Sequence, residues 1–587
     1  MKTESKDKKP DRSASKRGVH STEARFPVEY QTTAAVLVAR GKKRLEMILN
    51  SSDPAALVTR LPEREVFLTI KEVGERNAMD LIILTTPDQL THILDLELWK
   101  KDVINVDRAI LWFEILQGCG EKKLVQFFKT VDAELLICLF RKLIRVLKVE
   151  SAEEEPTGKH GQSLFTLDRV YYLEFLDKRV KVTLTRILDF LCSRNLRLYQ
   201  GLMESVLWDV PGENEALALR WRNGRLADRG FPDFDEALEV YSYVPPERVR
   251  GRRFEILPAL DQPSYPPTWV DVVGEGSFFS RVLRQGMNQT MIERLQWEII
   301  ALSNRILIAD AADPADAEAT YKSMRKAFQT LDLGLKYLSH EDPVKAAIVL
   351  RTVPTVTVFQ TGFSLGLRLR RKAESILKRG WLSRIDRGME IIDSPLKETM
   401  RGLLRKRPLF FCEESGGNER PFERLEEVEL VEHWLERISV LGKVVHEHFG
   451  ISADEINRVN PEICYLSDLP LSAICLTVLA NRIVRGEGGL EPIEPAWLER
   501  LFGFFMERRP GKHRARVKPD ISKRILEEFT SRGKWVSGRE KRVLSWWTDF
   551  LIHRLESAMG GTRHPEDIDP QYIDVFMIRR RDSHIRI

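Results

Sequence analysis

The sequence predicts a mainly α-helical protein, organised as a multi-domain helical array with at most one small β-hairpin. Apolar residues recur at spacings of three and four in nearly every apolar segment, which is the period of an amphipathic helix. Proline steps open a succession of short segments between residues 53 and 99, and clusters of Pro and Gly separate the longer ones. These observations favour stacked helices over a sheet.

Composition places the chain among ordinary globular proteins. Its 587 residues suggest three or four domains, and 43% of them are hydrophobic while 30% are charged. The 92 basic residues nearly balance the 87 acidic ones, which leaves a formal net charge of +5. A protein devoted to duplex nucleic acid usually carries a larger basic excess. Charge alone therefore does not identify the partner.

The ends and the cysteines indicate a cytoplasmic protein. Residues 1–24 are polar and basic, without the apolar core of a signal peptide, and we expect a disordered tail there. No stretch approaches the roughly 18 uninterrupted apolar residues that a membrane span requires. The six cysteines show no CxxC pairing and sit among apolar neighbours, as expected for buried thiols in a reducing compartment.

The segment 25–150 is predicted to stack short helices like an α-solenoid. Asp53-Pro54, Leu61-Pro62-Glu63 and Thr86-Pro87 each provide a proline for a first helical turn, and Asp53 and Thr86 can cap free amides. The last of these helices is expected over Ala133–Val149, where leucines form a broad apolar face.

The rest of the chain is divided by turn-forming residues. Alternating apolar residues near 164–175 suggest a small hairpin within a helical segment 151–243. Prolines and glycines then predict a strap or linker over 244–280. A helical domain 281–407, with helices opening at Asp313-Pro314 and Asp342-Pro343, a loop 408–421 and a helical domain 422–587 complete the predicted organisation.

The segment that begins at Asp53 and reads DPAALVTRLPEREV resembles known helical repeats. It is similar to the repeat of the N-terminal domain of MgtE-type magnesium transporters and to the middle region of the flagellar motor switch protein FliG. The resemblance covers about residues 44–150 and implies a surface that transmits contacts between proteins or domains. No channel helices follow it, so ion transport is not implied. As a whole, the chain resembles large cytosolic bacterial proteins of unknown function, most clearly over Arg220–Leu238.

One polar cluster is the best candidate site in the sequence. Its members surround Gly224 and Gly230-Phe231-Pro232: Arg222, Arg225, Asp228, Arg229, Asp233 and Asp235. Arginine forks suit anion or phosphate oxygens. The alternative is a helix–turn–helix corner, in which Gly supplies a positive φ, Phe231 fills the core and Arg–Asp pairs close the turn. We favour the corner.

Other motifs give weaker signals. His446-Glu447-His448 has its histidines two residues apart, which places them on different helix faces, so a solvated helix end is favoured over a metal site. The basic stretch within 364–379 could touch a membrane surface or RNA, but long basic side chains that snorkel from a core helix explain it more simply. No phosphate-binding glycine loop or serine nucleophile motif is recognisable, and we predict no cofactor, no metal and no catalytic residue.

These observations lead to a non-enzymatic scaffold or regulator that acts through protein–protein contacts. The first alternative is single-stranded nucleic-acid binding by the C-terminal part, where basic residues from Arg508 to Lys518 precede Trp535 and Trp546-Trp547. The second is an enzyme with a composite site near Arg220–Glu236.

Overall fold

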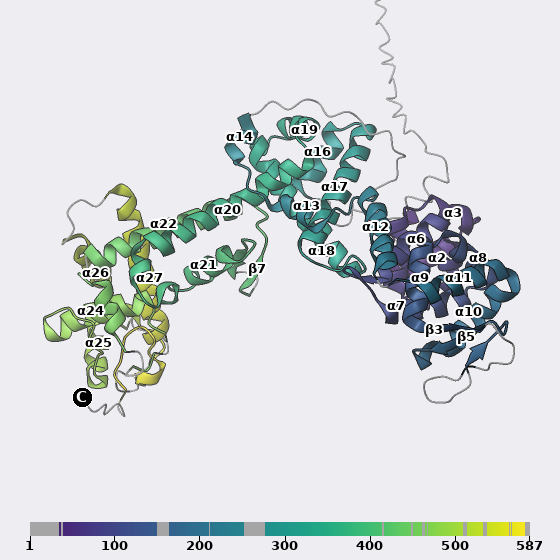
Figure 1. Cartoon of the computed structure of the whole chain (residues 1–587). Helices are drawn as coiled ribbons and strands as arrows, with labels where there is room; N and C mark the ends of the chain where they lie inside the picture. The colour runs from purple at the N-terminus through teal and green to yellow at the C-terminus, as the bar shows by residue number, and fades with distance from the viewer. Residues whose placement is uncertain are drawn as a thin grey trace, which may run out of the picture. The chain divides into compact units, whose positions relative to one another are not determined.

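Helices build almost all of the described chain in this computed structural model (Figure 1). The structure describes residues 35–580 except 37–38, 150–155, 157–163, 211, 252–275, 414–415, 448–449, 461–463, 467, 509–513, 532–536, 563, 565 and 567. The predicted tail 1–24 and Trp535 therefore lie outside the described residues. Two compact units are present, one ending at Arg220 and the other starting at Trp221. The mainly α fold class is confirmed, although the described residues form several short antiparallel strand pairs rather than at most one hairpin.

The first unit consists of short helices and two small sheets. Its elements are α2 (Gly41–Leu49), α3 (Pro54–Arg60), α4 (Glu63–Val73), α5 (Met79–Leu84), α6 (Pro87–Glu97), β1 (Trp99–Lys100), β2 (Val103–Ile104), α7 (Val106–Gly118), α8 (Glu121–Thr130), α9 (Ala133–Leu143), β3 (Ile144–Lys148), β4 (Phe165–Thr166), β5 (Tyr171–Phe175), η1 (Lys178–Val180), α10 (Lys181–Arg194), α11 (Leu196–Trp208) and the first half of α12 (Glu213–Asp228).

Local capping chemistry sets the starts of α3 and α6 as the sequence predicts. The Asp53 carboxylate accepts a hydrogen bond from the Ala56 amide at 2.9 Å. Thr86 and Gln89 form a reciprocal capping box at the start of α6. Pro62 precedes α4 as its N-cap, one position earlier than the first helical residue.

The predicted helix over Ala133–Val149 is too long, because residues 144–148 form strand β3. Strand β3 pairs antiparallel with β5, and β4 pairs with the other edge of β5 in the predicted hairpin. Ile144 and Val146 are buried and alternate with half-buried neighbours, so these residues satisfy a strand as well as a helix face. The pairing with β5, more than 20 residues away, decides between them.

The second unit contains the longer helices. Its elements are the second half of α12, α13 (Phe234–Leu238), η2 (Glu239–Tyr241), α14 (Pro246–Gly251), α16 (Phe278–Gly286), α17 (Gln289–Ala309), α18 (Ala317–Ser339), α19 (Pro343–Thr352), α20 (Thr355–Arg379), η3 (Trp381–Arg384), η4 (Gly388–Ile391), α21 (Leu396–Leu404), β6 (Phe410–Cys412), β7 (Asn418–Arg420), α22 (Leu425–Glu447), α23 (Ala453–Arg458), α24 (Leu471–Arg485), η7 (Pro495–Trp497), α25 (Leu498–Phe505), β8 (Met506–Glu507), β9 (Arg516–Val517), α26 (Pro519–Ser531), α27 (Gly538–Met559) and η9 (Pro570–Tyr572).

Helix α20 links two hydrophobic cores within this unit. Its first half packs with α17 and α18 in one core, and its second half joins α21, α22 and η3 in the other. Helices α18 and α20 touch backbone to backbone, because a Cβ on Gly334 would lie 2.0 Å from the Val358 carbonyl oxygen. This crossing fixes the frame in which the site described below is built.

Of the two helix starts predicted in this part of the second unit, one is corrected and one is confirmed. Helix α18 begins at Ala317 rather than at Asp313-Pro314. The Asp313 carboxylate accepts a hydrogen bond from the Ala315 amide in a turn before the helix, and Asp316 is the residue that caps the helix. Helix α19 begins at Pro343 with Asp342 as its cap, as predicted. The described start of the predicted strap forms helix α14.

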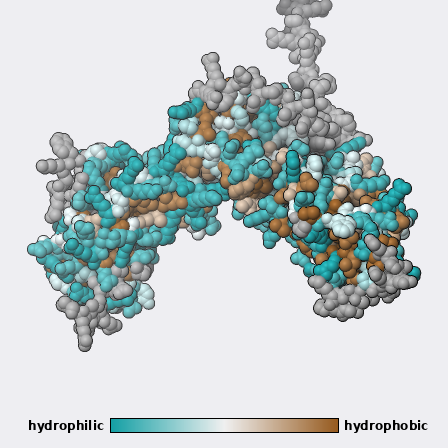
Figure 2. Space-filling model, viewed as in Figure 1, coloured by the Kyte–Doolittle hydropathy of each residue, from teal (hydrophilic) through white to brown (hydrophobic). Residues whose placement is uncertain are grey.

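The leucines and cysteines that are expected to be buried are buried, with one exception. Leu139 and Leu435 are both buried, and five of the six cysteines are buried free thiols, whereas Cys192 is half-exposed. Figure 2 shows polar residues over most of the visible face, with apolar residues in separate patches. Among the described helices, none is long and apolar enough to cross a membrane.

Candidate functional site

The predicted Arg–Asp cluster lies at the corner between α12 and α13. Arg222 is buried on α12, while Asp228, Asp233 and Asp235 are exposed. Arg225 and Arg229 are half-exposed and touch each other through a hydrogen bond from the Arg229 guanidinium to the Arg225 carbonyl oxygen, at 3.3 Å. An anion site here stays a prediction.

The corner itself has the geometry of a tight turn. Gly230 has a φ of +80°, which is the left-handed region that favours glycine. Phe231 is buried, and Asn304 of α17 donates a hydrogen bond to the Arg229 carbonyl oxygen at 3.2 Å. These contacts account for Gly230 and Phe231 by packing alone.

The basic stretch of α20 is largely engaged within the protein. Arg368 contacts Glu247 at 3.0 Å, and Lys372 contacts Glu432 at 2.6 Å. Arg370 pairs with Glu374, and the Arg371 guanidinium stacks 3.6 Å above the Tyr243 ring. Long basic side chains that cover neighbouring elements explain this part of the helix, whereas its last turn is a separate case treated below.

The C-terminal aromatic residues are used in packing. Trp547 is fully buried, and Trp546 lies under the Arg437 guanidinium at 4.3 Å. His446 is in the last turn of α22, and His448 is outside the described residues. In the part of the chain that the structure describes, no group of three His, Cys, Asp or Glu side chains is arranged to hold a metal ion.

The best candidate site was not predicted from the sequence. It is a groove of about 840 Å³ in the second unit, between α18, α20 and the segment from Arg405 to Phe422. Its floor is apolar and comprises Leu333, Phe363, Pro408, Leu409 and Phe422. Its rim carries both signs of charge, with Glu318 and Lys322 on α18, Asp316 at the cap of that helix, and Lys406 on the segment from Arg405 to Phe422.

A polar cluster closes one end of this groove around the Asp310 carboxylate. Tyr241 donates a hydrogen bond to Asp310 Oδ1 at 2.8 Å, and Lys326 Nζ lies 2.8 Å from Oδ2. Arg407 forms an ion pair with the same carboxylate and also stacks 4.0 Å above the Tyr241 ring. Each group therefore holds another in place, across η2, α17, α18 and the loop after α21.

In this cluster two cationic side chains, Lys326 and Arg407, balance the charge of the partly buried Asp310 carboxylate. Burial lowers the pKa of the Lys326 ammonium, although the neighbouring Asp310 opposes that shift. Burial and the same carboxylate raise the pKa of Tyr241. Because Asp310 is engaged by three donors, it is not free to act as a base, and the cluster is suited to holding the walls of the groove in place.

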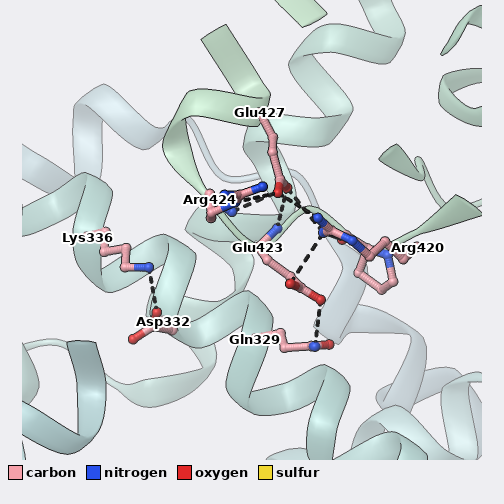
Figure 3. A network of polar contacts seen from close by, with 8 residues as sticks. Gln329, Asp332, Lys336, Arg420, Glu423, Arg424 and Glu427 are labelled. Carbon is pink, nitrogen blue, oxygen red and sulfur yellow. Dashed lines mark hydrogen bonds and ion pairs between the residues drawn. The ribbon is translucent and has the colours of Figure 1, made fainter. Parts of the chain in front are cut away.

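A second network of polar contacts lies at the end of the segment 405–422, which forms the wall of the groove facing α18 (Figure 3). The Glu427 carboxylate accepts hydrogen bonds from Arg420 at 2.7 Å, from Arg424 at 2.9 Å and from the Glu423 amide at 2.9 Å. Burial alone would raise the pKa of Glu427, but these donors hold it below its usual value. Gln329 of α18 donates to Glu423 at 2.7 Å and so ties the two walls together.

One signal in the sequence could have pointed to the groove. Gly362 and Gly366 are four residues apart on α20 and therefore share a helix face, which indicates close approach of another element. A Cβ on Gly362 would meet the Thr330 carbonyl oxygen at 2.2 Å, and one on Gly366 would meet Pro408 at 3.4 Å. Both glycines line the groove.

Comparison with known proteins assigns a family without a known function. Residues 23–579 match the family of unknown function DUF6178, so the chain belongs to that family. No curated protein and no solved structure matches the chain. The comparisons do not support the resemblance of residues 44–150 to the MgtE and FliG repeats, although the predicted run of short helices is present.

Proposed function

We propose that this member of the DUF6178 family is a cytoplasmic, non-enzymatic scaffold that binds a partner protein in the groove beside α18. The observation that carries the proposal is the combination of an apolar floor with a charged rim on a frame held by two polar networks. Protein-binding surfaces have this anatomy, in which an apolar centre takes an anchor residue and polar residues surround it.

The groove is suited to an apolar anchor flanked by charged residues. Phe363 and Leu409 are half-buried, so the floor keeps apolar surface that a partner side chain can cover. On the rim, Lys322 and Lys406 are exposed, and neither is within ion-pair distance of a carboxylate among the described residues. Asp316 and Glu318 lie on the same rim. We infer a partner segment that carries an apolar anchor with at least one acidic neighbour.

The nucleic-acid alternative is less well supported by the geometry. Stacking of bases requires exposed rings in a basic groove. Trp547 is inaccessible, and Trp546 is covered by Arg437 on one side and contacts Phe550 at a centroid distance of 5.7 Å.

The test is capture of the partner by groove variants of the full chain. Lys322→Glu reverses a rim charge, and Arg325→Glu is the matched control, because Arg325 is also exposed on α18 but does not line the groove. Each protein is used as bait in nuclease-treated native lysate, and captured proteins are then re-examined with purified components. We expect the partner to be lost with Lys322→Glu and retained with Arg325→Glu.

Two results would contradict the proposal. Capture from a parallel untreated lysate that is absent from the nuclease-treated lysate would favour nucleic acid. Equal capture by wild type and by a variant with a filled groove, Ala319→Trp, would place the contact elsewhere on the chain, since Ala319 lines the groove.

A further inference from the structure

A second cavity in the same unit lies at the far end of α20. It has a volume of about 750 Å³, within the range of small-molecule sites, and is bounded by the last turns of α20, by η3, by the second half of α22 and by α23. It shares no lining residue with the groove described above. An inference about it is therefore independent of the proposed scaffold function.

The charge of this cavity is one-sided. Among the described residues, three cationic side chains line it, Arg379, Arg384 and Lys443, together with His446, against one carboxylate, Asp454. Lys443 is balanced by Glu540 at 2.6 Å. Arg379 and Arg384 are exposed, and among the described residues no carboxylate lies within ion-pair distance of either guanidinium.

This pattern differs from the rest of α20. Earlier on the same helix, Arg368 and Lys372 each meet a carboxylate of another element. A cation in the last turn of a helix is favoured by the helix dipole, which accounts for Lys378 or Arg379. The dipole of α22 accounts in the same way for His446, but the dipole of α20 does not account for Arg384, which reaches the same cavity from η3.

Close packing and hydrogen bonds support the walls of the cavity. Trp381 fills the space beside Gly442 so closely that a Cβ there would lie 1.3 Å from the indole ring, and its Nε1 donates to the Ile438 carbonyl oxygen at 3.1 Å. Asn457 of α23 accepts from the Asp386 amide at 2.9 Å and donates to the Arg384 carbonyl oxygen at 3.1 Å. The backbone that carries Arg384 is thus held on both sides before any ligand arrives.

The remaining lining offers both polar and apolar contacts. Ser375 and Ser439 supply hydroxyl donors at the cavity. Trp381, Ile385 and Ile456 supply apolar surface on the same walls. Planar guanidinium groups bind phosphate oxygens through two parallel hydrogen bonds, and hydroxyl groups complete such a shell.

We propose that this cavity is a binding site for a small phosphorylated ligand, with Arg379 and Arg384 holding the phosphate group. The volume exceeds that of inorganic phosphate, so a diphosphate or an organic phosphate fits the space. An organic body would lie against Trp381 and Ile385.

The test is calorimetric titration of the full-length chain with two probes, inorganic pyrophosphate and adenosine monophosphate. We expect saturable binding of at least one of them, weakened about tenfold or more in Arg379→Ala and in Arg384→Ala, as loss of a charge-assisted contact implies. Lys378→Ala is the matched control, because Lys378 is a cation beside Arg379 that does not line the cavity. Its affinity should stay within about twofold of wild type.

The two probes distinguish the source of the phosphate, because tighter binding of the monophosphate indicates an organic ligand and tighter binding of pyrophosphate an inorganic one. Absence of saturable binding of both up to about 10 mM would overturn the proposal, since that affinity is below the range of specific sites. Equal weakening by Lys378→Ala would also overturn it, because the effect would then be diffuse surface charge. Circular dichroism spectra of the variants confirm that each is folded.

Discussion

Replacement of Gly334 by alanine is expected to destabilise the second unit, against the intrinsic preference of a helix. Alanine is favoured over glycine in a helix interior by about 1 kcal/mol. At Gly334, however, the new Cβ would lie 2.0 Å from the Val358 carbonyl oxygen and 2.9 Å from the Gly362 nitrogen, both backbone atoms of α20. Neither atom can move unless the two helices separate.

The magnitude follows from these two opposing effects. Overpacking of a close contact costs about 1 to 3 kcal/mol, and a backbone-to-backbone clash belongs at the upper end of that range. Subtraction of the helix-propensity gain leaves a net loss of about 2 kcal/mol. Gly362→Ala should lower the free energy of unfolding by a similar amount, because its Cβ would meet the Thr330 carbonyl oxygen at 2.2 Å. The double variant should cost less than the sum, since both substitutions open the same gap.

A matched control isolates the clash. Gly503 lies in α25 of the same unit and is exposed, and a Cβ added there would meet no atom within 4 Å, so Gly503→Ala should gain about 0.5 to 1 kcal/mol. Because the chain has two units, hydrogen exchange of peptides from α18 and α20 measures the relevant opening energy better than one melting curve. Stabilisation by Gly334→Ala similar to that by Gly503→Ala would refute the close crossing, and with it the frame of the groove.

Three further predictions test the cores and the polar clusters of the structure. Leu435→Ala should cost about 2 to 5 kcal/mol by denaturation, because the side chain is 2% exposed in the core between α20 and α27; an unchanged midpoint would mean that this face is open. Burial raises the pKa of Asp393 to about 6, so the folded state binds its proton more readily than the unfolded state; the unfolding free energy should therefore include about 1 kcal/mol more at pH 5 than at pH 7, and Asp393→Asn should remove that increment. Tyr241→Phe should cost about 1 to 2 kcal/mol by removing a donor from the Asp310 carboxylate, and no loss would show that Lys326 and Arg407 suffice.

Those parts of the fold that depend on neighbouring residues are predictable from the sequence. Asp53, Thr86 and Asp342 cap α3, α6 and α19, because a cap needs only the amides of the next three residues. Residues 144–148 are wrongly predicted as helix because their apolar pattern fits both structures, and only the pairing with β5 favours the strand. The start of α18 is predicted too early because Asp313 and Asp316, three residues apart, are both suited to cap a helix, and only Asp316 does so.

The groove is not predictable from the sequence in the same way. Its rim and floor come from three stretches, around residues 310–333, 362–366 and 405–422, whose proximity depends on the packing of α20 against α18. Tyr241, Asp310 and Arg407 are inconspicuous where they stand in the sequence, and their chemistry arises only from contact. The cluster near Arg222 is conspicuous because its residues are close together in the chain, which is the feature that sequence inspection detects most readily.

Helix α20 takes part in both proposed sites, and its packing determines whether they can communicate. Gly362 and Gly366 line the groove, whereas Ser375 and Arg379 line the phosphate cavity, and the nine residues from Gly366 to Ser375 correspond to about 14 Å of helix. Coupling between two sites requires an element with two alternative positions, each favoured by one ligand. Helix α20 has little room to slide or rotate, because its backbone touches α18 at Gly334 and Gly362. The packing of Trp381 against Gly442 restrains the segment that follows the helix. We therefore expect the partner protein and the phosphorylated ligand to bind independently, so that a groove substitution such as Lys322→Glu leaves the affinity for pyrophosphate unchanged.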